Sequence, residues 1–306
     1  MVSDYNLNEF KCYLLETFKA FIEFCQQHGL TYYAAYGTAL GAIRHQGYIP
    51  WDDDVDVYMP RKDYNKLLEL RCELEKSDYE IIDIDSEVGA GSLPTQKLPS
   101  KAVKVISKSC QRNSTLIEKP GEPSLGIYVD IFPLDYYDNK YCKPLIRYNE
   151  LYRYLWLIYG HGARKHSIYS LFHIVRSGKE RFHINFTAFL DISVFKLLQL
   201  PARYLIDKFQ NRLMNMPKSD YFWLYSIISC ESFPMPKEWF GEGKMMAFEN
   251  IEVCMPNNYD AYLTRVYGDY MTPPPIEKRP SHHARYFVDF HRRLTIDEIR
   301  EIKLSK

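Results

Sequence analysis

A short alternation of acidic and apolar residues constrains this chain more than any other feature. Residues 52–57 read Asp-Asp-Asp-Val-Asp-Val. Because successive side chains of a β-strand point to opposite faces, Asp54 and Asp56 would share one face and the two valines the other. We therefore predict a strand that turns its valines into a core and two carboxylates toward an accessible surface.

Two carboxylates on one face of a strand are suited to a divalent cation. Side chains two residues apart lie roughly 7 Å apart at Cβ, so both can reach one hard cation. Without it, two like charges ~4 Å apart repel by about 4 kcal/mol at an effective dielectric of ~20. We predict Mg²⁺ or Mn²⁺ at Asp54 and Asp56. A solvated acidic loop is the alternative, which suits Asp52 and Asp53 better, although Asp53 stays a site candidate.

Gly37 and Thr38 lie upstream of this strand, where a short strand is expected to end and a helix to begin. A glycine at that position lets backbone N–H groups approach a phosphate, and the N-terminus of the following helix favours anions. Arg44 would lie further along this helix as a cation facing the phosphate. Trp51, beside the acids, is a candidate wall for a base or a choline group, or else part of the core.

A third carboxylate is expected on a neighbouring strand. In residues 128–132, Asp130 is the single charge among apolar strand formers. A buried aspartate needs a cation or several hydrogen-bond donors. We predict that Asp130 joins the metal site, with a buried structural carboxylate as the alternative. Asp135, which follows the next proline, is expected in a loop or at a cap.

The first 135 residues alternate helical and strand patterns. Apolar residues at steps of three and four predict a helix over 7–28, and Gly29 is suited to end it. Strands are expected at 32–36, 55–59, 79–84, 102–107 and 126–132. The fold class predicted from this order is α/β (α+β), a mixed sheet flanked by helices.

The region 140–240 has a different character. Between Lys143 and Arg212 there are 12 Lys and Arg against 4 Asp and Glu, a net charge of +8, whereas the whole chain has 39 of each sign. Aromatic and aliphatic residues recur there at helical spacing. A basic, aromatic, helical surface suits anionic lipid or phosphate, and a solvated helical face is the alternative. We predict peripheral membrane contact through residues 143–212.

Composition narrows the class of protein. Hydrophobic residues make up 46% and charged residues 25%, which excludes disorder as the main organisation. A net charge of zero disfavours a nucleic-acid partner. The seven cysteines include no C-x-x-C pair, and we find no signal sequence and no apolar stretch of ~20 residues. We expect a cytoplasmic protein that contacts the inner face of a membrane.

Three stretches of the chain resemble the LicD family, which includes the fukutin relatives. They read G-T-x-L-G-x-x-R-x-x-G-x-I-P-W-D-D-D-x-D from Gly37 to Asp56, V-D-I-F-P-L-D at 129–135 and P-N-N-Y-D-x-Y-L-x-x-x-Y-G-D at 256–269. This family belongs to the nucleotidyltransferase-fold superfamily, whose pattern is a Gly-Ser/Thr turn, a D-x-D strand and a later carboxylate. The resemblance therefore implies a nucleotidyltransferase-like sheet.

The resemblance also implies an activity. Such enzymes transfer a phospho-alcohol, here with phosphocholine favoured, from a CDP-activated donor to a sugar hydroxyl and release CMP. The acceptor would be a cell-surface glycan, such as lipopolysaccharide or teichoic acid, or its lipid-linked precursor. Asp54 and Asp56 would hold Mg²⁺, Asp130 would complete the metal shell or accept the hydroxyl proton, and Gly37 and Thr38 would position the phosphates.

Further cations are expected to contact the phosphates. Arg44 would be joined by Lys278 and Arg279, which a proline-rich loop delivers. His282 is a candidate phosphate donor or weak base, although a histidine in a polar loop is more often at the surface. A strand at 251–255 and a helix over 259–267 would precede this loop.

We expect three parts in this chain. Residues 1–139 would form the nucleotidyltransferase-like core with its N-terminal helix. Residues 140–240 would form a helical, basic, aromatic-rich insertion that faces the acceptor or a membrane. Residues 241–306 would pack back on the core and complete the site.

Three other functions compete with this prediction. A GT-A-type glycosyltransferase also uses D-x-D and a metal but releases a nucleoside diphosphate; the Gly-Thr turn upstream argues against it. A conventional nucleotidyltransferase would release pyrophosphate. A non-catalytic protein that binds glycans or membranes would be expected to have lost acids, and every expected acid is present.

Overall fold

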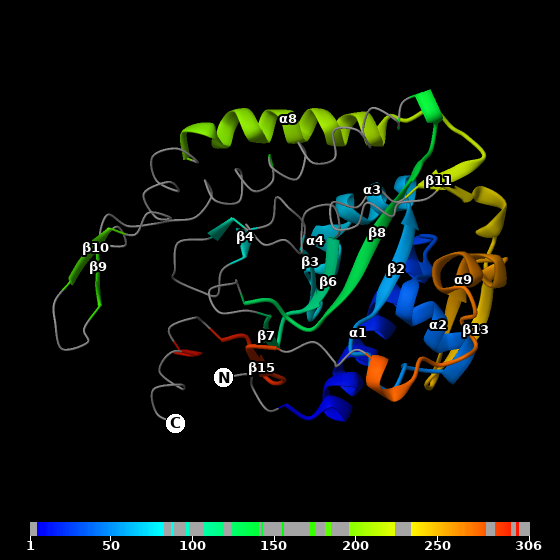
Figure 1. Ribbon diagram of the computed structural model, residues 1–306, viewed down its shortest axis with the longest axis horizontal. Coiled ribbons are helices and arrows are strands. Elements are labelled where there is room, and N and C mark those ends of the chain that lie inside the picture. The colour runs from blue at the N-terminus through cyan, green and yellow to red at the C-terminus, as the bar shows by residue number, and fades with distance from the viewer. Residues whose placement is uncertain are drawn as a thin grey trace.

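The computed structural model of the protein describes residues 5–82, 87–88, 96–97, 107–118, 124–140, 142, 155, 172–175, 181–184, 196–223, 234–279, 285–294 and 298–299. These residues form an α+β fold in which helices flank a mixed sheet, which confirms the predicted fold class (Figure 1).

The sheet is organised around β8 (Tyr128–Tyr136). On one side, β2 (Asp56–Pro60) pairs with β8 in parallel, and β1 (Tyr33–Ala34) pairs with β2 antiparallel. On the other side, β6 (Ser107–Gln111) pairs antiparallel with β8, and β3 (Tyr79–Ile82) pairs with β6. Figure 1 shows β2 and β8 running side by side through the centre of the molecule.

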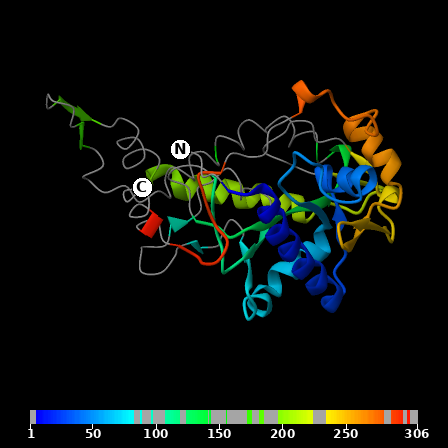
Figure 2. The ribbon, with the colours of Figure 1, turned by 90° about the horizontal axis from the view of Figure 1, so that it is seen from below.

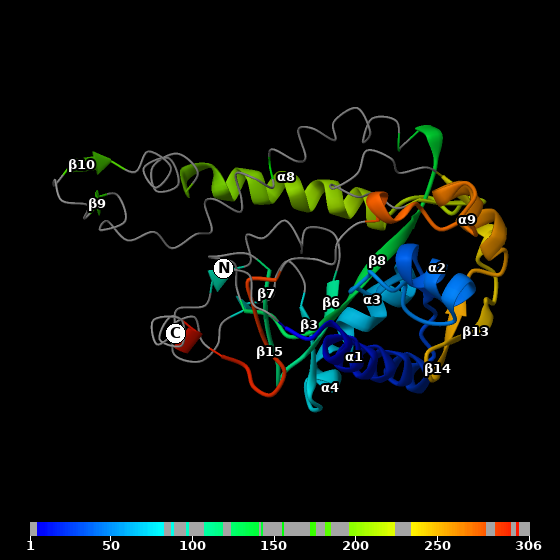
Figure 3. The same cartoon turned by 60° about the horizontal axis from the view of Figure 1, so that its bottom comes forward.

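The predicted N-terminal helix is confirmed as α1 (Leu7–His28). The side chain of Asn6 accepts hydrogen bonds from the first-turn N–H groups, and Gly29 ends the helix at φ 58°. Its buried face packs against β6 and β8 (Figure 3).

Three further helices follow α1 in the N-terminal half. They are α2 (Tyr36–His45), α3 (Arg61–Glu69) and α4 (Arg71–Leu74). The helix α3 follows β2 directly, because Pro60 ends the strand and forms the N-terminal cap of the helix. The chain therefore passes from the strand into the helix without an intervening loop.

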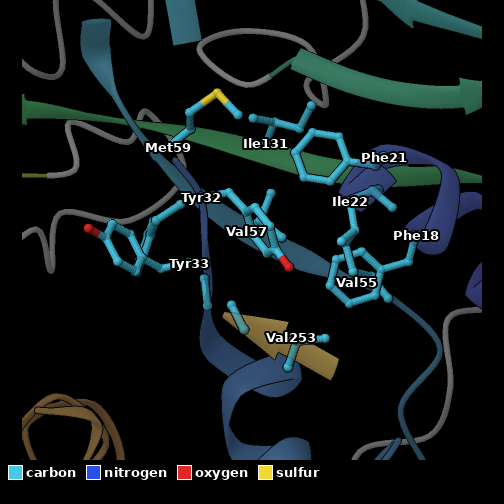
Figure 4. Close-up of a cluster of buried hydrophobic side chains, with 14 of the residues drawn as sticks. Phe18, Phe21, Ile22, Tyr32, Tyr33, Val55, Val57, Met59, Ile131 and Val253 are labelled. Carbon is cyan, nitrogen blue, oxygen red and sulfur yellow. The ribbon is translucent and has the colours of Figure 1, made fainter. Parts of the chain in front are cut away.

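The alternation of valine and aspartate predicts burial correctly. Val55 and Val57 are buried, and Figure 4 shows them in the core with Ile131 of β8 and Phe18 of α1. The aspartates that alternate with them are partly exposed. The strand itself begins at Asp56, although the carbonyl oxygen of Val55 already accepts a hydrogen bond of 2.8 Å from the N–H of Asp130.

The C-terminal part also follows its predicted pattern. The strands β13 (Lys244–Phe248) and β14 (Ile251–Met255) form a hairpin, and α9 (Tyr259–Tyr267) ends at Gly268. The hairpin lies beside β1 and α2, and α9 also packs against α2 (Figure 3).

Two more elements connect distant parts of the chain. The short helix η4 (Lys237–Trp239) packs against α9, and β15 (Phe287–Asp289) pairs with β7 (Thr115–Ile117). A last helical turn, η5 (Ile276–Lys278), follows the proline-rich loop.

The predicted helical insertion contains both helix and strand. The helix α8 (Lys196–Met214) is continuous despite Pro201 (Figure 2). Strand pairing, which the sequence signalled weakly, joins β9 (Phe172–Val175) to β10 (Arg181–Ile184). Two further strands, β11 (Tyr221–Trp223) and β12 (Met235–Pro236), extend the main sheet from β8.

Some expectations concern parts of the chain that are not described. The strand expected at 102–107 overlaps the description only at residue 107, where β6 begins. The small hairpin of β4 (Glu87–Val88) and β5 (Gln96–Lys97) was not anticipated. Within the described ranges, none of the helices combines the length and apolar character needed to cross a bilayer.

Candidate functional site

Three charged side chains lie in one row across three neighbouring strands. Asp56 of β2 lies opposite Asp130 of β8, and Lys108 of β6 lies opposite Asp130 on its other side. Side chains that lie directly opposite each other point to the same face of a sheet. We call Asp56, Asp130 and Lys108 the polar row. The next register pair, Val57 and Ile131, is buried, so the polar row faces away from that part of the core.

Lys108 and Asp130 form an ion pair within the polar row. The Lys108 ammonium donates to Oδ1 of Asp130 and lies 3.4 Å from the centroid of the Tyr128 ring. The Lys108 side chain is 1% exposed and that of Asp130 is 15% exposed. Burial raises the pKa of Asp130, while the Lys108 charge acts in the opposite direction.

Asp54 and Asp56 stand close to this pair. Burial raises the pKa of Asp56 well above its usual range, and the charges of Asp54, Asp130 and Asp52 raise it further. Asp54, Asp56 and Asp130, which we call the acidic cluster, therefore lie near enough to repel one another. A hard divalent cation would relieve that repulsion, because carboxylate oxygens are its preferred ligands.

The donor set thus fits Mg²⁺ or Mn²⁺ in its chemistry, but it is not a preformed cage. Among the residues that the structure describes, no three His, Cys, Asp or Glu side chains gather as a group that could hold a metal ion. The predicted metal site therefore stays a prediction that rests on the chemistry and proximity of these acids.

Gly37 and Thr38 lie inside the first turn of α2, not ahead of the helix as we expected. The buried Thr38 hydroxyl accepts a hydrogen bond of 2.8 Å from the backbone N–H of Asp56. A Cβ at position 37 would collide with the carboxylate of Asp52. These two residues therefore set the distance between the start of α2 and the acidic segment.

The turn that precedes these residues has an unusual backbone. Tyr36 has φ 42°, in the left-handed region that bulky side chains rarely occupy. Its N–H donates a hydrogen bond of 2.9 Å to the hydroxyl of Tyr262 on α9. Its ring packs edge-on against Tyr58 of β2 and Phe132 of β8. The surrounding packing thus fixes a turn that would otherwise be unfavourable.

Arg44 and Arg279 lie near each other, and we call them the cationic edge. Nη1 of Arg44 donates to the carbonyl oxygen of Tyr270 at 2.9 Å. The guanidinium of Arg279 lies 4.4 Å from the centroid of the Trp51 ring. Burial lowers the pKa of Arg44 and so does the nearby charge of Arg279, so these two predicted cations share one edge. Lys278 is exposed beside Arg279.

Asp53 has contacts that differ from those of the acidic cluster. Its buried carboxylate lies 3.5 Å from Arg285 and accepts a hydrogen bond of 3.1 Å from the Tyr5 hydroxyl. The expectation of a solvated loop residue is therefore wrong for Asp53. Asp135 also differs from its expectation, because it lies within β8 and is buried in a two-point ion pair with Arg61 at 2.7 and 2.8 Å.

Two residues near the site were not anticipated. Lys108 stands in a polar stretch, Ser-Lys-Ser-Cys-Gln, which gives no sign that its side chain is buried beside an acid. Tyr267 belongs to the motif at 256–269; burial raises its pKa and so do the charges of Asp56 and Asp52, so its hydroxyl is near the acids. His282 lies outside the described residues.

Comparison with known proteins identifies relatives that cover the residues of the candidate site. Residues 29–149 match the family described as "LicD/FKTN/FKRP, nucleotidyltransferase domain". The lipopolysaccharide cholinephosphotransferase LicD of Haemophilus influenzae is 25% identical over 286 residues, or 91% of this chain and 96% of that protein. An uncharacterized protein of Rickettsia typhi is 32% identical over 148 residues, or 48% of this chain and 42% of the relative. The family match includes the acidic cluster and Lys108.

Proposed function

Because this chain belongs to the LicD family, we propose that it transfers phosphocholine from CDP-choline to a hydroxyl group of a cell-surface glycan or its lipid-linked precursor. The chain is a phosphotransferase. The observation that carries the choice of phosphocholine is the similarity to the Haemophilus influenzae cholinephosphotransferase over 96% of that protein.

The reaction is a displacement at the phosphorus that bears choline. The acceptor oxygen forms a new bond to this phosphorus while the bond to the bridging diphosphate oxygen breaks, and CMP leaves with that electron pair. The hydroxyl proton passes to a base. Asp130 is the candidate base or a further ligand, since it belongs to the acidic cluster and retains partial exposure.

The acidic cluster and the cationic edge would each bind a different part of the donor complex. Asp54 and Asp56, with Asp130, would hold a divalent cation, which supplies neutralisation of the charge that grows on the leaving CMP. Arg44 and Arg279 would contact phosphate oxygens. Trp51 has one face occupied by Arg279, so it supports that guanidinium rather than offering an open ring to choline there.

A donor screen tests the proposed activity. The purified chain is incubated with CDP-choline, CDP-ribitol, CDP-glycerol or CDP-ethanolamine and a crude glycolipid acceptor, and nucleotide products are separated by chromatography. CMP release with CDP-choline that depends on the acceptor is expected. Release of a nucleoside diphosphate from nucleotide sugars would support a glycosyltransferase instead, and pyrophosphate released from CTP would support a conventional nucleotidyltransferase.

Metal dependence is tested in the same assay. We expect EDTA to abolish CMP release and an excess of Mg²⁺ or Mn²⁺ to restore it, because three neighbouring carboxylates would repel a diphosphate unless a cation lay between them. Turnover that persists in EDTA after exhaustive dialysis would contradict the metal assignment and leave the transferase assignment to the donor screen.

We also propose that α8 contacts an anionic membrane surface during transfer to a lipid-linked acceptor. Leu197, Leu200 and Tyr204 recur at helical spacing and are 78%, 79% and 66% exposed, whereas Ala202 and Ile206 on the opposite side are buried. This exposed stripe has basic neighbours, since the helix carries Lys208 and Arg212 as well as Arg203, which forms an ion pair of 2.8 Å with Asp207. Apolar residues beside cations suit an anionic lipid interface.

Sedimentation with liposomes tests the α8 contact. Wild-type protein should bind phosphatidylglycerol-containing vesicles, and binding should weaken as salt rises, because exposed charges are screened beyond ~8 Å at physiological ionic strength. The variant Leu200→Gln plus Tyr204→Gln should lose binding, whereas Met245→Gln, at another exposed apolar residue, should retain it. Equal binding by both variants would reject this surface.

A further inference from the structure

We infer that Lys108 is a positioning residue that holds the Asp130 carboxylate in its working orientation. This inference deepens the proposed function and rests on it. Lys108 and Asp130 come from adjacent antiparallel strands and are register partners, so the contact is built into the sheet and does not depend on a loop. Asp56 is the register partner of Asp130 on β2, so it lies beside the pair in the sheet.

The contact leaves part of Asp130 available. The ammonium donates to Oδ1, and among the described residues no hydrogen bond to Oδ2 is observed. Asp130 is partly exposed, whereas Lys108 is almost fully buried. Lys108 therefore approaches from the protein side, which suits a group that orients a carboxylate rather than one that meets a substrate itself.

A second contact fixes Lys108 in turn. Its ammonium lies over the ring of Tyr128, which stands two residues before Asp130 on β8, at 3.4 Å from the centroid. The Tyr128 hydroxyl donates to Glu118. A lysine held between a ring and a carboxylate has little freedom to rotate, so the direction of the Asp130 carboxylate is determined before any ligand arrives.

The charge of Lys108 also limits repulsion in the acidic cluster. Asp54, Asp56 and Asp130 would bring three negative charges to a small space, and Lys108 compensates one of them. A divalent cation would then meet an arrangement with two net negative charges, which matches its own charge.

A double-mutant cycle with two readouts tests this role. The variants are Lys108→Met, Asp130→Asn, the two combined, and Lys237→Met as a matched control. Lys237 also lies over a tyrosine ring, that of Tyr136, but is exposed and has no carboxylate contact among the described residues. Mn²⁺ affinity is measured by isothermal titration, and kcat and KM for CDP-choline by CMP release.

We expect Lys108→Met to weaken Mn²⁺ binding and to lower kcat, each by about 10- to 100-fold, as loss of a residue behind a ligand usually does. The KM for the donor should change much less. In the Asp130→Asn background, the Lys108 substitution should cause no further loss, because a positioning residue acts only through its partner. The Lys237→Met control should match the wild type.

Two results would overturn the inference. One is a folded Lys108→Met variant with wild-type Mn²⁺ affinity and kcat. The other is a double variant in which the losses of the two single variants add fully. If Lys108→Met unfolds because Asp130 is left buried and unpaired, the comparison of Asp130→Asn with the double variant decides, since neither retains that charge. Failure of wild-type protein to release CMP would reject the proposed function instead, and the Mn²⁺ titrations would still test Lys108.

Discussion

Asp53 and Asp54 are neighbours in the chain but belong to two different regions. The Asp53 carboxylate is buried with Arg285 and Tyr5, and Arg285 also forms an ion pair of 3.1 Å with Glu118. Burial and the neighbouring Asp53 charge raise the pKa of Tyr5 to about 12. Asp54 instead joins the acidic cluster, where Lys108 is the nearby cation that opposes the rise in the pKa of Asp56.

The difference between these regions is one of charge balance. Around Asp53 the chain supplies its own cation and hydroxyl donor, so the group is complete as a structural element. In the acidic cluster, Lys108 pairs with Asp130, and burial together with the charges of Asp54, Asp130 and Asp52 raises the pKa of Asp56. A protein retains such unfavourable repulsion where a ligand relieves it, which is typical of functional sites.

The largest effect is expected from removing charge in the acidic cluster. Asp54→Asn plus Asp56→Asn should reduce CMP release by about three orders of magnitude or more, because charge stabilisation of several kcal/mol is lost. The fold should remain, as judged by circular dichroism. Asp53→Asn is the matched control, which should lower the melting temperature and leave turnover nearly intact. Loss of turnover in the control alone would reverse our assignment of the two regions.

Removing the cation of the structural region should mainly affect stability. Arg285→Met leaves Asp53 and Glu118 without their guanidinium, so the free energy of unfolding should fall by about 3–5 kcal/mol. Urea denaturation measures this change. Arg292→Met, at an exposed arginine 3.8 Å from Asp289, should cost no more than about 1 kcal/mol. Equal effects of the two substitutions would show that the Asp53 region is not an integrated structural element.

The hydroxyl of Thr38 connects α2 to the acidic segment, and its loss should have a smaller effect. Thr38→Val leaves the N–H of Asp56 without its acceptor, which should cost about 1–3 kcal/mol in the free energy of unfolding. Thr38→Ser retains a hydroxyl and should recover most of that loss. If the Thr38→Val and Thr38→Ser variants have the same free energy of unfolding in urea, the hydrogen bond does not contribute to stability.

The smallest expected effect concerns pH. The pKa of Asp56 is higher in the folded protein than the value of about 3.9 in an unfolded chain, so the folded state binds more protons above that pH. Stability therefore falls as pH rises through this window. Asp56→Asn lacks this penalty, so in EDTA its melting temperature should exceed that of wild type by a few degrees at neutral pH, with no difference below pH ~4. A difference in melting temperature that grows toward acid pH would contradict a raised pKa of Asp56 in the folded protein.

Local patterns predicted several elements because short-range rules determine them. The helix Leu7–His28 has a periodic apolar face, a capping Asn6 and a terminal Gly29. The burial of Val55 and Val57 followed from the period of a strand. Each of these features depends on residues within a few positions, so the chain alone contains the necessary information.

Residues that depend on long-range pairing could not be predicted in the same way. The position of Lys108 opposite Asp130 results from the register of β6 on β8, which no local pattern in a polar strand specifies. The burial of Asp53 depends on Arg285, more than two hundred residues later in the chain. The candidate acids could therefore be named from the sequence, but the cations that lie beside Asp53 and Asp130 could not.

The left-handed turn at Tyr36 has a consequence for how the chain could be divided. Its N–H is satisfied by Tyr262, far outside the stretch of 29–149 that matches the nucleotidyltransferase domain. A fragment cut at residue 149 would lose that hydroxyl and the helix that carries it, and the turn would be free to relax toward ordinary backbone angles. Expression of the matched stretch alone should therefore not yield an autonomous catalyst, because the conformation at the start of α2 is maintained by the distal end of the polypeptide.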